Sequence, residues 1–451
     1  MTIRLPRIEA ILDGPLTEAL PPSALKRLLA ARVSESWDID FKRELYSRTP
    51  AGDEELAKDV AAMANSVGGV IVLGIGEKED IAVEAPGVEL SRETKESMRQ
   101  TIAARVRPFP EYEVLEVAED GGGDRGFYLI VVAANAAAPF LVQTRSGGSK
   151  PSWGFPRRQQ AHTVWLGEHE IAAAYRDRLT RAQVHAGRLQ NVSELMDRQL
   201  DRGSRGWVQV TVVPEIPGSF ELSTKSVAEL EKWVYEAQHR GPAPPVTPLP
   251  LASRTRFRRV ELTADLRPSF WKSDSVALHT DGSASLAYLA TAPVDPSDPA
   301  TAAGPPTFFE TVLAARLLAG MDLAAQYASS RAGCSGGCTI ELRLTCPGLG
   351  GDPEPCALRP ARIREPWGTL GPGLDTTNDV PAITASAELA DLSSPIAICR
   401  VARGVLSDCL TAFGHAECRA IGQDFRPLLA AWQQLDRDNL ERWLALPEKT
   451  R

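Results

Sequence analysis

The sequence predicts an α+β fold in two domains. Residues 37–44 alternate between apolar and charged side chains, as a half-buried strand does. A helical pattern over 54–63 ends near Gly68-Gly69 and leads into the apolar run 70–73, which predicts a buried strand. From residue 207 onward, further strand patterns alternate with helical ones, which predicts a second α+β domain.

Composition limits the classes of function. The chain has 451 residues, of which 43% are hydrophobic, so it is long enough for two or three domains with their own cores. The formal net charge of −8 argues against a protein that coats duplex DNA mainly by neutralising phosphates, but leaves room for a local basic groove. Residues 1–31 lack the apolar core of a signal peptide, and the longest apolar stretch, 127–142, is interrupted by Asn135 and Pro139. We therefore expect no membrane partner.

The seven cysteines all lie beyond residue 330. An odd count without a secretory signal is typical of a reducing compartment, so we expect a cytoplasmic protein. The spacing of Cys334, Cys338, Cys346 and Cys356 matches no common zinc module. We expect buried thiols there, with a zinc site as the alternative.

Turn residues and changes of pattern suggest the domain boundaries. We expect an N-terminal extension over 1–20, a first domain over 21–185, a linker over 186–206 and a second α+β domain over 207–451. Within the second domain, residues 275–288 predict a hairpin that turns at Asp281-Gly282. Helical patterns follow over 309–323, 396–413 and 425–446, so this domain should end in a helical tail.

The strand over 37–44 carries the first candidate site. Alternation places Trp37, Ile39 and Phe41 on one face, and Asp38, Asp40, Lys42 and Glu44 on the other. Carboxylates can hold a divalent cation while a nearby ammonium stabilises charge on a phosphate, and Glu35 lies just upstream. The alternative is the solvated face of an amphipathic strand.

Glycines after the buried strand could suggest a nucleotide loop. However, Gly74-x-Gly76 lacks a third glycine, no helix obviously follows it, and no Gly-Lys-Ser/Thr ending occurs in the chain. We therefore expect no nucleotide cofactor, and keep a nucleotide-binding signalling protein only as a further alternative. Asn65, before the glycine pair, is expected to make a local turn or cap contact.

Basic residues of the first domain are candidates for nucleic-acid binding: Arg105, Arg107, Arg157 and Arg158. Arg157-Arg158 lies close to Trp153 and Phe155, a combination of cations and aromatic rings that suits single-stranded or structured RNA. The alternative is a solvated strand edge with a packed aromatic side chain.

Taken in order, these segments resemble the Schlafen-type AlbA domain family over about residues 20 to 182. The matching motifs are Glu35, Asp40-Phe41-Lys42, Ala62–Gly69, Gly74–Glu77, the strand Phe127–Val132 and Gly154–Arg158. The resemblance implies a mixed sheet with flanking helices. The chain departs from the family pattern at Asp40, where glutamate is expected, and at Glu77, where aspartate is commoner.

The resemblance implies two functional classes. Some members are divalent-metal-dependent endoribonucleases acting on structured RNA such as tRNA, and their acidic triad corresponds by position to Glu35, Asp40 and Glu77. These three residues would bind Mg²⁺ or Mn²⁺, and Lys42 would complete the catalytic set by stabilising the scissile phosphate. Other members are DNA-binding or regulatory proteins. We therefore expect a nucleic-acid-acting protein, first an endoribonuclease, for example in stress or phage defence, and alternatively a non-catalytic transcriptional regulator.

Two further expectations concern the assembly. In the family, two such lobes cradle RNA, so a chain with one lobe is expected to form a homodimer. We identify no catalytic residues in the second domain, and expect it to act in sensing or dimerisation.

Overall fold

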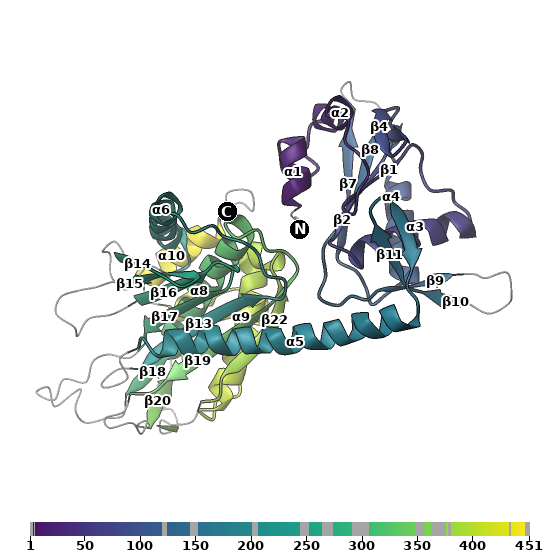
Figure 1. The fold of residues 1–451 in the computed structure, drawn as a ribbon. Coiled ribbons are helices and arrows are strands. Elements are labelled where there is room, and N and C mark those ends of the chain that lie inside the picture. Colours follow the sequence, from purple (N-terminus) through teal and green to yellow (C-terminus); the bar gives the residue numbers. More distant parts are fainter. Residues whose placement is uncertain are drawn as a thin grey trace, which may run out of the picture. The chain divides into compact units, whose positions relative to one another are not determined.

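The computed structural model describes residues 3, 5–119, 124–144, 152–200, 206–243, 252–263, 274–290, 306–347, 355–361, 376–377, 380–432 and 434–446. The chain divides into two compact units, Met1–Val184 and His185–Arg451, called unit 1 and unit 2 below. Each unit contains both helices and strands (Figure 1). The predicted α+β class is therefore confirmed.

Unit 1 is built around a mixed five-stranded sheet in the order β1-β2-β8-β5, with β7 also paired to β8. Strands β1 and β2 are parallel, and the other pairs are antiparallel. A small sheet β10-β9-β6 and the two-stranded ribbon β11-β12 stand apart from it. The elements are α1 (Pro6–Leu12), α2 (Pro22–Ala30), β1 (Ile39–Lys42), α3 (Pro50–Ala64), β2 (Gly69–Leu73), β3 (Gly76–Lys78), β4 (Ile81–Glu84), β5 (Val88–Glu89), α4 (Arg92–Arg105), β6 (Val106–Arg107), β7 (Tyr112–Ala118), β8 (Arg125–Val132), β9 (Leu141–Thr144), β10 (Ser152–Gly154), β11 (Pro156–Gln159), β12 (His162–Trp165) and α5 (Glu168–Asp197).

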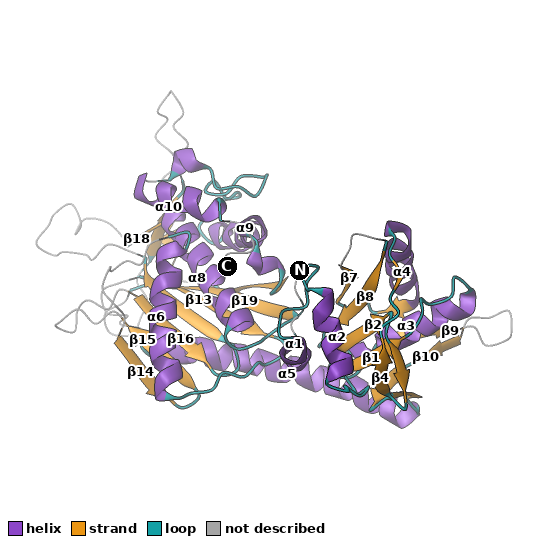
Figure 2. Cartoon of the chain, turned by 90° about the horizontal axis from the view of Figure 1, so that it is seen from above, coloured by secondary structure: helices purple, strands orange, loops and turns teal. Residues whose placement is uncertain are grey.

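Helices cover both faces of the unit 1 sheet (Figure 2). Helices α1 and α2 pack on one face, and α3 and α4 pack on the other. Ile8, Leu12 and Leu16 are buried in the first of these cores, so residues of the expected N-terminal extension are part of the folded unit. Because apolar side chains from both faces of β2 are covered, Gly69–Leu73 is wholly buried, as predicted for this strand.

The first strand differs from its sequence pattern. Strand β1 is shorter than 37–44, and only Ile39 and Phe41 of the expected apolar face are buried, whereas Trp37 is about half exposed. Asp40 belongs to the expected solvated face but is only 1% exposed. A carboxylate at this depth needs partners, because an unpaired buried charge is very costly.

Helix α3 begins and ends as its residues suggest. The Thr49 side chain accepts a hydrogen bond from the backbone N–H of Gly52, which caps the helix. Beyond its end, Gly68 and Gly69 have φ values of 77° and 154°, and a Cβ at Gly69 would lie 2.7 Å from the carbonyl oxygen of Asp38. Only glycine lets the chain turn this closely against β1. Strand β3 begins at Gly76, whereas the glycine loop of a dinucleotide-binding site is followed by a helix.

Unit 2 is built on an antiparallel seven-stranded sheet in the order β14-β15-β16-β17-β13-β19-β22. Its elements, after the second half of α5, are β13 (Trp207–Pro214), α6 (Thr224–Arg240), β14 (Ala252–Arg256), β15 (Arg259–Thr263), β16 (Asp274–His279), β17 (Ala284–Leu289), β18 (Thr307–Phe309), α8 (Glu310–Ser330), β19 (Gly337–Thr345), β20 (Cys356–Arg359), β21 (Thr376–Thr377), β22 (Ile383–Glu388), η1 (Asp391–Ser393), α9 (Pro395–Thr411), η2 (Leu429–Ala431) and α10 (Gln434–Leu444). The predicted hairpin over 275–288 corresponds to β16 and β17, and two of the predicted helical stretches to α8 and α9.

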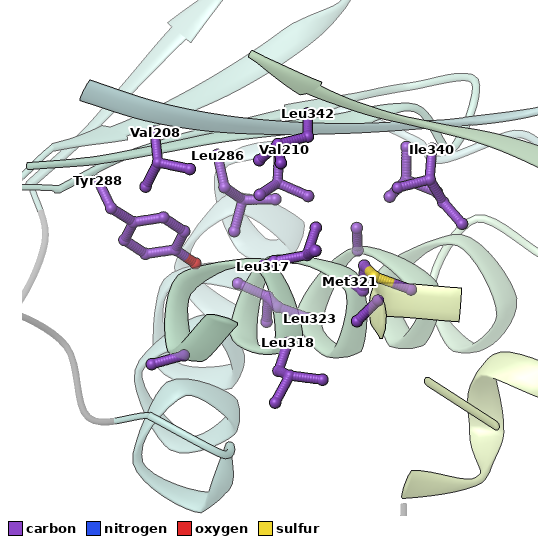
Figure 3. Close-up of a cluster of buried hydrophobic side chains, with 14 of the residues drawn as sticks. Val208, Val210, Leu286, Tyr288, Leu317, Leu318, Met321, Leu323, Ile340 and Leu342 are labelled. Atoms are coloured by element: carbon purple, nitrogen blue, oxygen red, sulfur yellow. The ribbon is translucent and has the colours of Figure 1, made fainter. Parts of the chain in front are cut away.

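One face of this sheet forms the main core of unit 2. Val210 and Leu286 point toward Leu317 and Met321 of α8 (Figure 3). The opposite face of β13 carries the buried polar side chains of Gln209 and Thr211 as well as Trp207, and Gln209 donates to the backbone carbonyl oxygen of Ser193 in α5. The sheet is therefore sandwiched between an apolar helical layer and the end of α5.

The expected linker over 186–206 is partly helical. Residues 186–197 belong to α5, and Val192 and Met196 are buried, because this end of the helix packs on unit 2. Residues 201–205 lie outside the described part of the chain.

All seven cysteines are buried and none forms a disulfide, as expected for structural thiols. Among the described residues, no cluster of three or more His, Cys, Asp or Glu side chains is arranged to hold a metal ion. Within the same residues, no helix is long and apolar enough to cross a membrane.

Candidate functional site

The predicted catalytic residues line one cleft of about 600 Å³ in unit 1. Strand β1, helix α3, the β3-β4 hairpin and the β11-β12 ribbon form its walls. Its lining contains seven carboxyl side chains and four lysine or arginine side chains: Glu35, Asp40, Glu55, Asp59, Glu77, Asp80, Glu84, Lys42, Arg43, Lys58 and Arg158. The candidate residues Glu35, Asp40, Lys42 and Glu77 therefore share one cleft, in which carboxyl groups outnumber lysines and arginines.

Asp40 is held by two cations at the bottom of this cleft. Arg158 donates from Nη1 to Oδ1 at 2.6 Å, and Lys42 donates from Nζ to Oδ2 at 2.6 Å. Arg158 is only 6% exposed, and it also donates to the carbonyl oxygens of Ser36 and Ile39. Both oxygens of Asp40 therefore already have charged partners, and Arg158 is buried as the counter-ion of this acid.

Glu35 shares the same arginine. Its Oε1 accepts the backbone N–H of Phe41 at 2.7 Å, and its Oε2 lies 3.4 Å from Nη2 of Arg158. Burial raises the pKa of Glu35 from 4.5 to about 7, and the nearby Asp40 charge contributes in the same direction. Glu35 and Asp40 thus form a buried acid pair around one guanidinium group.

The raised pKa of Glu35 predicts a pH-dependent stability. Because the folded-state pKa lies above that of the unfolded chain, the unfolded chain binds fewer protons between about pH 4.5 and pH 7. The contribution of Glu35 to the free energy of unfolding is therefore fully present below this window and is lost as the pH rises through it. We expect Glu35→Gln to flatten this part of the stability profile, measured by urea unfolding from pH 4.5 to 8. Glu44→Gln, at an exposed position, is the control; parallel profiles for wild type and Glu35→Gln would contradict the prediction.

Two residues of the network were not predicted. Asp59 of α3 lies 3.5 Å from Nζ of Lys42 and accepts a hydrogen bond from Tyr46 at 2.9 Å. Burial alone would lower the pKa of Lys42, but Asp40 and Asp59 outweigh it and raise that pKa above its usual value. A sequence signal existed for Asp59, because it falls three residues after Leu56 on the buried face of the helix.

Glu77 lies in the cleft without joining the buried acids. Its Oε2 accepts the backbone N–H of Asp80 at 2.7 Å and so closes the β3-β4 turn. Since both oxygens of Asp40 are held by cations, the arrangement of Glu35, Asp40 and Glu77 does not fit a metal ion bridged by these three acids.

The four candidate arginines have different roles. Arg105 is largely buried, donates to the carbonyl oxygen of Gln143 and lies 3.8 Å from a carboxylate oxygen of Asp53. Arg107 is exposed, but it folds back onto the C-terminal carbonyl groups of α4. Arg157 is exposed on β11, and its side chain has no hydrogen-bond or ion-pair partner within the described residues. Of the four, Arg157 is the most available to a ligand.

The end of α3 holds the ribbon that carries Arg157 and Arg158. Asn65 donates to the carbonyl oxygens of Phe140 and Pro156, both at 2.7 Å, and Ser66 donates to that of Arg158 at 3.0 Å. Asn65 is the C-cap residue of α3, as expected for a cap contact, and its side chain in addition bonds to residues far along the chain. Through these bonds the helix end fixes the start of the ribbon and places the Arg158 side chain under the cleft.

Two exposed tryptophans lie on strands β10 and β12, which respectively precede and pair with the strand that carries Arg157. Trp153 of β10 and Trp165 of β12 are 54% and 48% exposed. The Trp165 ring covers Gly154, where an added Cβ would lie 2.5 Å from the ring. Trp165 pairs with Pro156 across the ribbon, whereas Arg157 pairs with Val164, so alternation places the Trp165 and Arg157 side chains on opposite faces of this two-stranded ribbon. We call Trp153, Arg157 and Trp165 the aromatic ribbon surface.

Comparison with known families identifies the domain. The sequence model described as "Schlafen, AlbA_2" matches residues 35–150, which contain the acids of the cleft and most of the unit 1 sheet. The chain therefore carries a Schlafen/AlbA-type domain in its N-terminal part, as the sequence motifs predicted. A domain of this family indicates a nucleic-acid-related function.

Among solved structures, the chain is similar to the DIP2311 protein from Corynebacterium diphtheriae. The two are 20% identical over 34% of this chain and 27% of that chain, with a TM-score of 0.23. The matched part thus spans about a quarter of that protein. No curated protein sequence matches this chain.

Proposed function

We propose that unit 1 binds single-stranded or structured nucleic acid on its aromatic ribbon surface, and that the acidic cleft beside it is an ion-paired framework. The observation that carries this proposal is the pair of half-exposed tryptophans together with, on the strand between them in sequence, an arginine with no partner in the described chain. Tryptophan suits an interaction surface, because its ring system is largely apolar while its N–H can stay in water.

The chemistry of the surface suits nucleic acid. Unpaired bases stack on tryptophan with about 1–3 kcal/mol per base, and an arginine beside the ring can neutralise a phosphate. Stacking needs bases that are not already paired, which favours single strands, loops and ends over regular duplex. The acidic cleft is a poorer place for the phosphate backbone, because its carboxyl groups outnumber its lysines and arginines.

The test is binding of fluorescently labelled RNA and DNA strands to the whole chain in EDTA, followed by anisotropy. Trp153→Ala and Trp165→Ala are each expected to weaken binding by about 5-fold or more, and Arg157→Ala to lower the dependence of affinity on salt. Trp37→Ala is the matched control, since Trp37 is also about half exposed but lies outside the ribbon. Equal binding by wild type and the two ribbon variants would contradict the proposed surface.

A second candidate function is the metal-dependent endoribonuclease. The surplus of carboxyl groups in the cleft favours it, because a net negative cleft attracts divalent cations. This function would require Arg158 or Lys42 to leave Asp40. Incubation of the protein with tRNA in Mn²⁺ or Mg²⁺, beside Asp40→Asn, separates the two candidates. If the wild-type protein cleaves tRNA and the Asp40→Asn variant does not, the nuclease function is established. The ion-paired cleft would then be the inactive conformation of the site.

A further inference from the structure

Strands β14 and β15 of unit 2 form a hairpin whose tip is basic and aromatic. Arg256 and Arg259 pair across the strands and close a two-residue turn, Phe257-Arg258. Phe257 is 87% exposed, the largest exposed fraction among the exposed large apolar side chains of the described chain. The hairpin carries three further arginines besides Arg258: Arg254, Arg256 and Arg259.

The charges at the tip are only partly balanced. Glu261 on β15 pairs with Arg256 at 3.2 Å and with Arg259 at 2.7 Å. Arg258 is exposed, and its side chain has no polar partner in the described part of the chain. Glu261 can balance one charge of the two arginines that it pairs with, and Arg258 adds a further positive charge at the turn.

The turn itself goes against local preference. Two-residue hairpin turns favour Asn-Gly or Gly-containing pairs, because these residues adopt positive φ without strain. Here Arg258 has a φ of 56°. A hydrogen bond helps to hold this conformation, because the carbonyl oxygen of Arg258 accepts the backbone N–H of Thr280, just after β16, at 3.0 Å. Arginines alone on an edge strand would be explained as protection against aggregation. An exposed phenylalanine would weaken that protection, so the combination needs another explanation.

We propose that this hairpin tip is a second contact for single-stranded nucleic acid, in which Phe257 stacks on an unpaired base and Arg258 with its neighbours neutralises phosphates. The inference extends the proposed function to unit 2. A single aromatic ring within a cationic turn matches the alternation of base and phosphate along a strand. Binding to an anionic lipid surface usually requires a broad apolar face. The only large apolar side chain at this turn is Phe257, so the tip fits a single-stranded nucleic acid better than a lipid surface.

The experiment measures binding of the whole chain to a labelled single-stranded RNA and to DNA of the same sequence, over a range of salt concentrations. Phe257→Ala is expected to weaken binding by about 5-fold or more. Arg258→Gly removes the charge and suits the positive φ, so the fold is retained while the slope of log K against log salt decreases by about 0.7. Arg32→Gly is the matched control, because Arg32 is an exposed arginine of unit 1 with a φ of 49°.

The outcomes separate the two proposals. If Trp153→Ala weakens binding while Phe257→Ala and Arg258→Gly match Arg32→Gly, the hairpin contact is wrong and the function of unit 1 stands. If only the hairpin variants weaken binding, the hairpin contact stands and the aromatic ribbon surface is wrong. Phe257-dependent sedimentation with phosphatidylserine vesicles, without Phe257-dependent RNA binding, would overturn the nucleic-acid assignment.

Discussion

Replacing Arg158 with methionine is expected to lower the free energy of unfolding of unit 1 by about 3–5 kcal/mol. The guanidinium group is the buried partner of Asp40 and lies close to Glu35, so its removal leaves two acids without their shared counter-ion. Lys42 would still hold one oxygen of Asp40, which keeps the expected loss below that of a fully isolated charge. Urea unfolding of the whole chain, followed by a signal from unit 1, measures the effect.

The neighbouring arginine provides the control. Arg157→Met changes the same residue type one position away, but on an exposed side chain, so its effect is expected within about 0.5 kcal/mol. The double variant Asp40→Asn/Arg158→Met should recover part of the loss, because it removes the unpaired charge together with its partner. If the two single arginine variants are equally stable, Arg158 is not the counter-ion of the acid pair.

Glu310→Ala is expected to destabilise unit 2 by about 3–6 kcal/mol. Glu310 is fully buried at the start of α8, and its carboxylate accepts three backbone N–H groups, those of Ala361, Arg419 and Ala420. Each donor left unsatisfied in the interior costs about 1–3 kcal/mol, and the alanine variant also leaves a cavity. Denaturant unfolding followed by a unit 2 signal is the measurement.

Two variants sharpen this second prediction. Glu310→Gln keeps one carbonyl oxygen as an acceptor and should lose less stability than Glu310→Ala. Glu417→Ala removes an exposed carboxylate close in sequence to two of the donors, and is expected within about 0.5 kcal/mol of wild type. A loss below about 1 kcal/mol for Glu310→Ala would show that the three amide groups find other partners.

Local patterns predicted the elements that local forces determine. The capped helix before Gly68-Gly69, the buried strand over 70–73 and the hairpin that turns at Asp281-Gly282 all depend on residues close together in the chain. Periodicity and turn preferences describe these elements because the side chains that decide them are neighbours. The family motifs, read in order, also brought Glu35, Asp40 and Lys42 to one cleft.

The ion pairs and the burial of the side chains in that cleft could not be predicted from local patterns. Arg158 and Asp40 form their hydrogen-bonded ion pair although 118 positions separate them in the sequence. Periodic patterns describe neighbouring residues and cannot predict such a long-range pair. The sequence alone makes Asp40 a candidate metal ligand and Arg158 a candidate nucleic-acid contact, and it does not show that the two side chains form an ion pair. Trp37 was placed on the buried face because alternation alone does not show that β1 begins only at Ile39. The environments of Trp37, Asp40 and Arg158 depend on burial and on long-range pairing, and both are properties of the whole fold.

The buried cysteines give unit 2 a chemical reporter that unit 1 lacks. All seven thiols belong to unit 2, and unit 1 has none. Burial raises the pKa of the Cys334 and Cys409 thiols to about 12, so the reactive thiolate is scarce while the fold stays closed. Alkylation of Cys334 and Cys409 by a thiol reagent then requires unit 2 to open. Mass spectrometry of the alkylated chain can therefore time the unfolding of unit 2 without any introduced label, while unit 1 remains unmodified throughout.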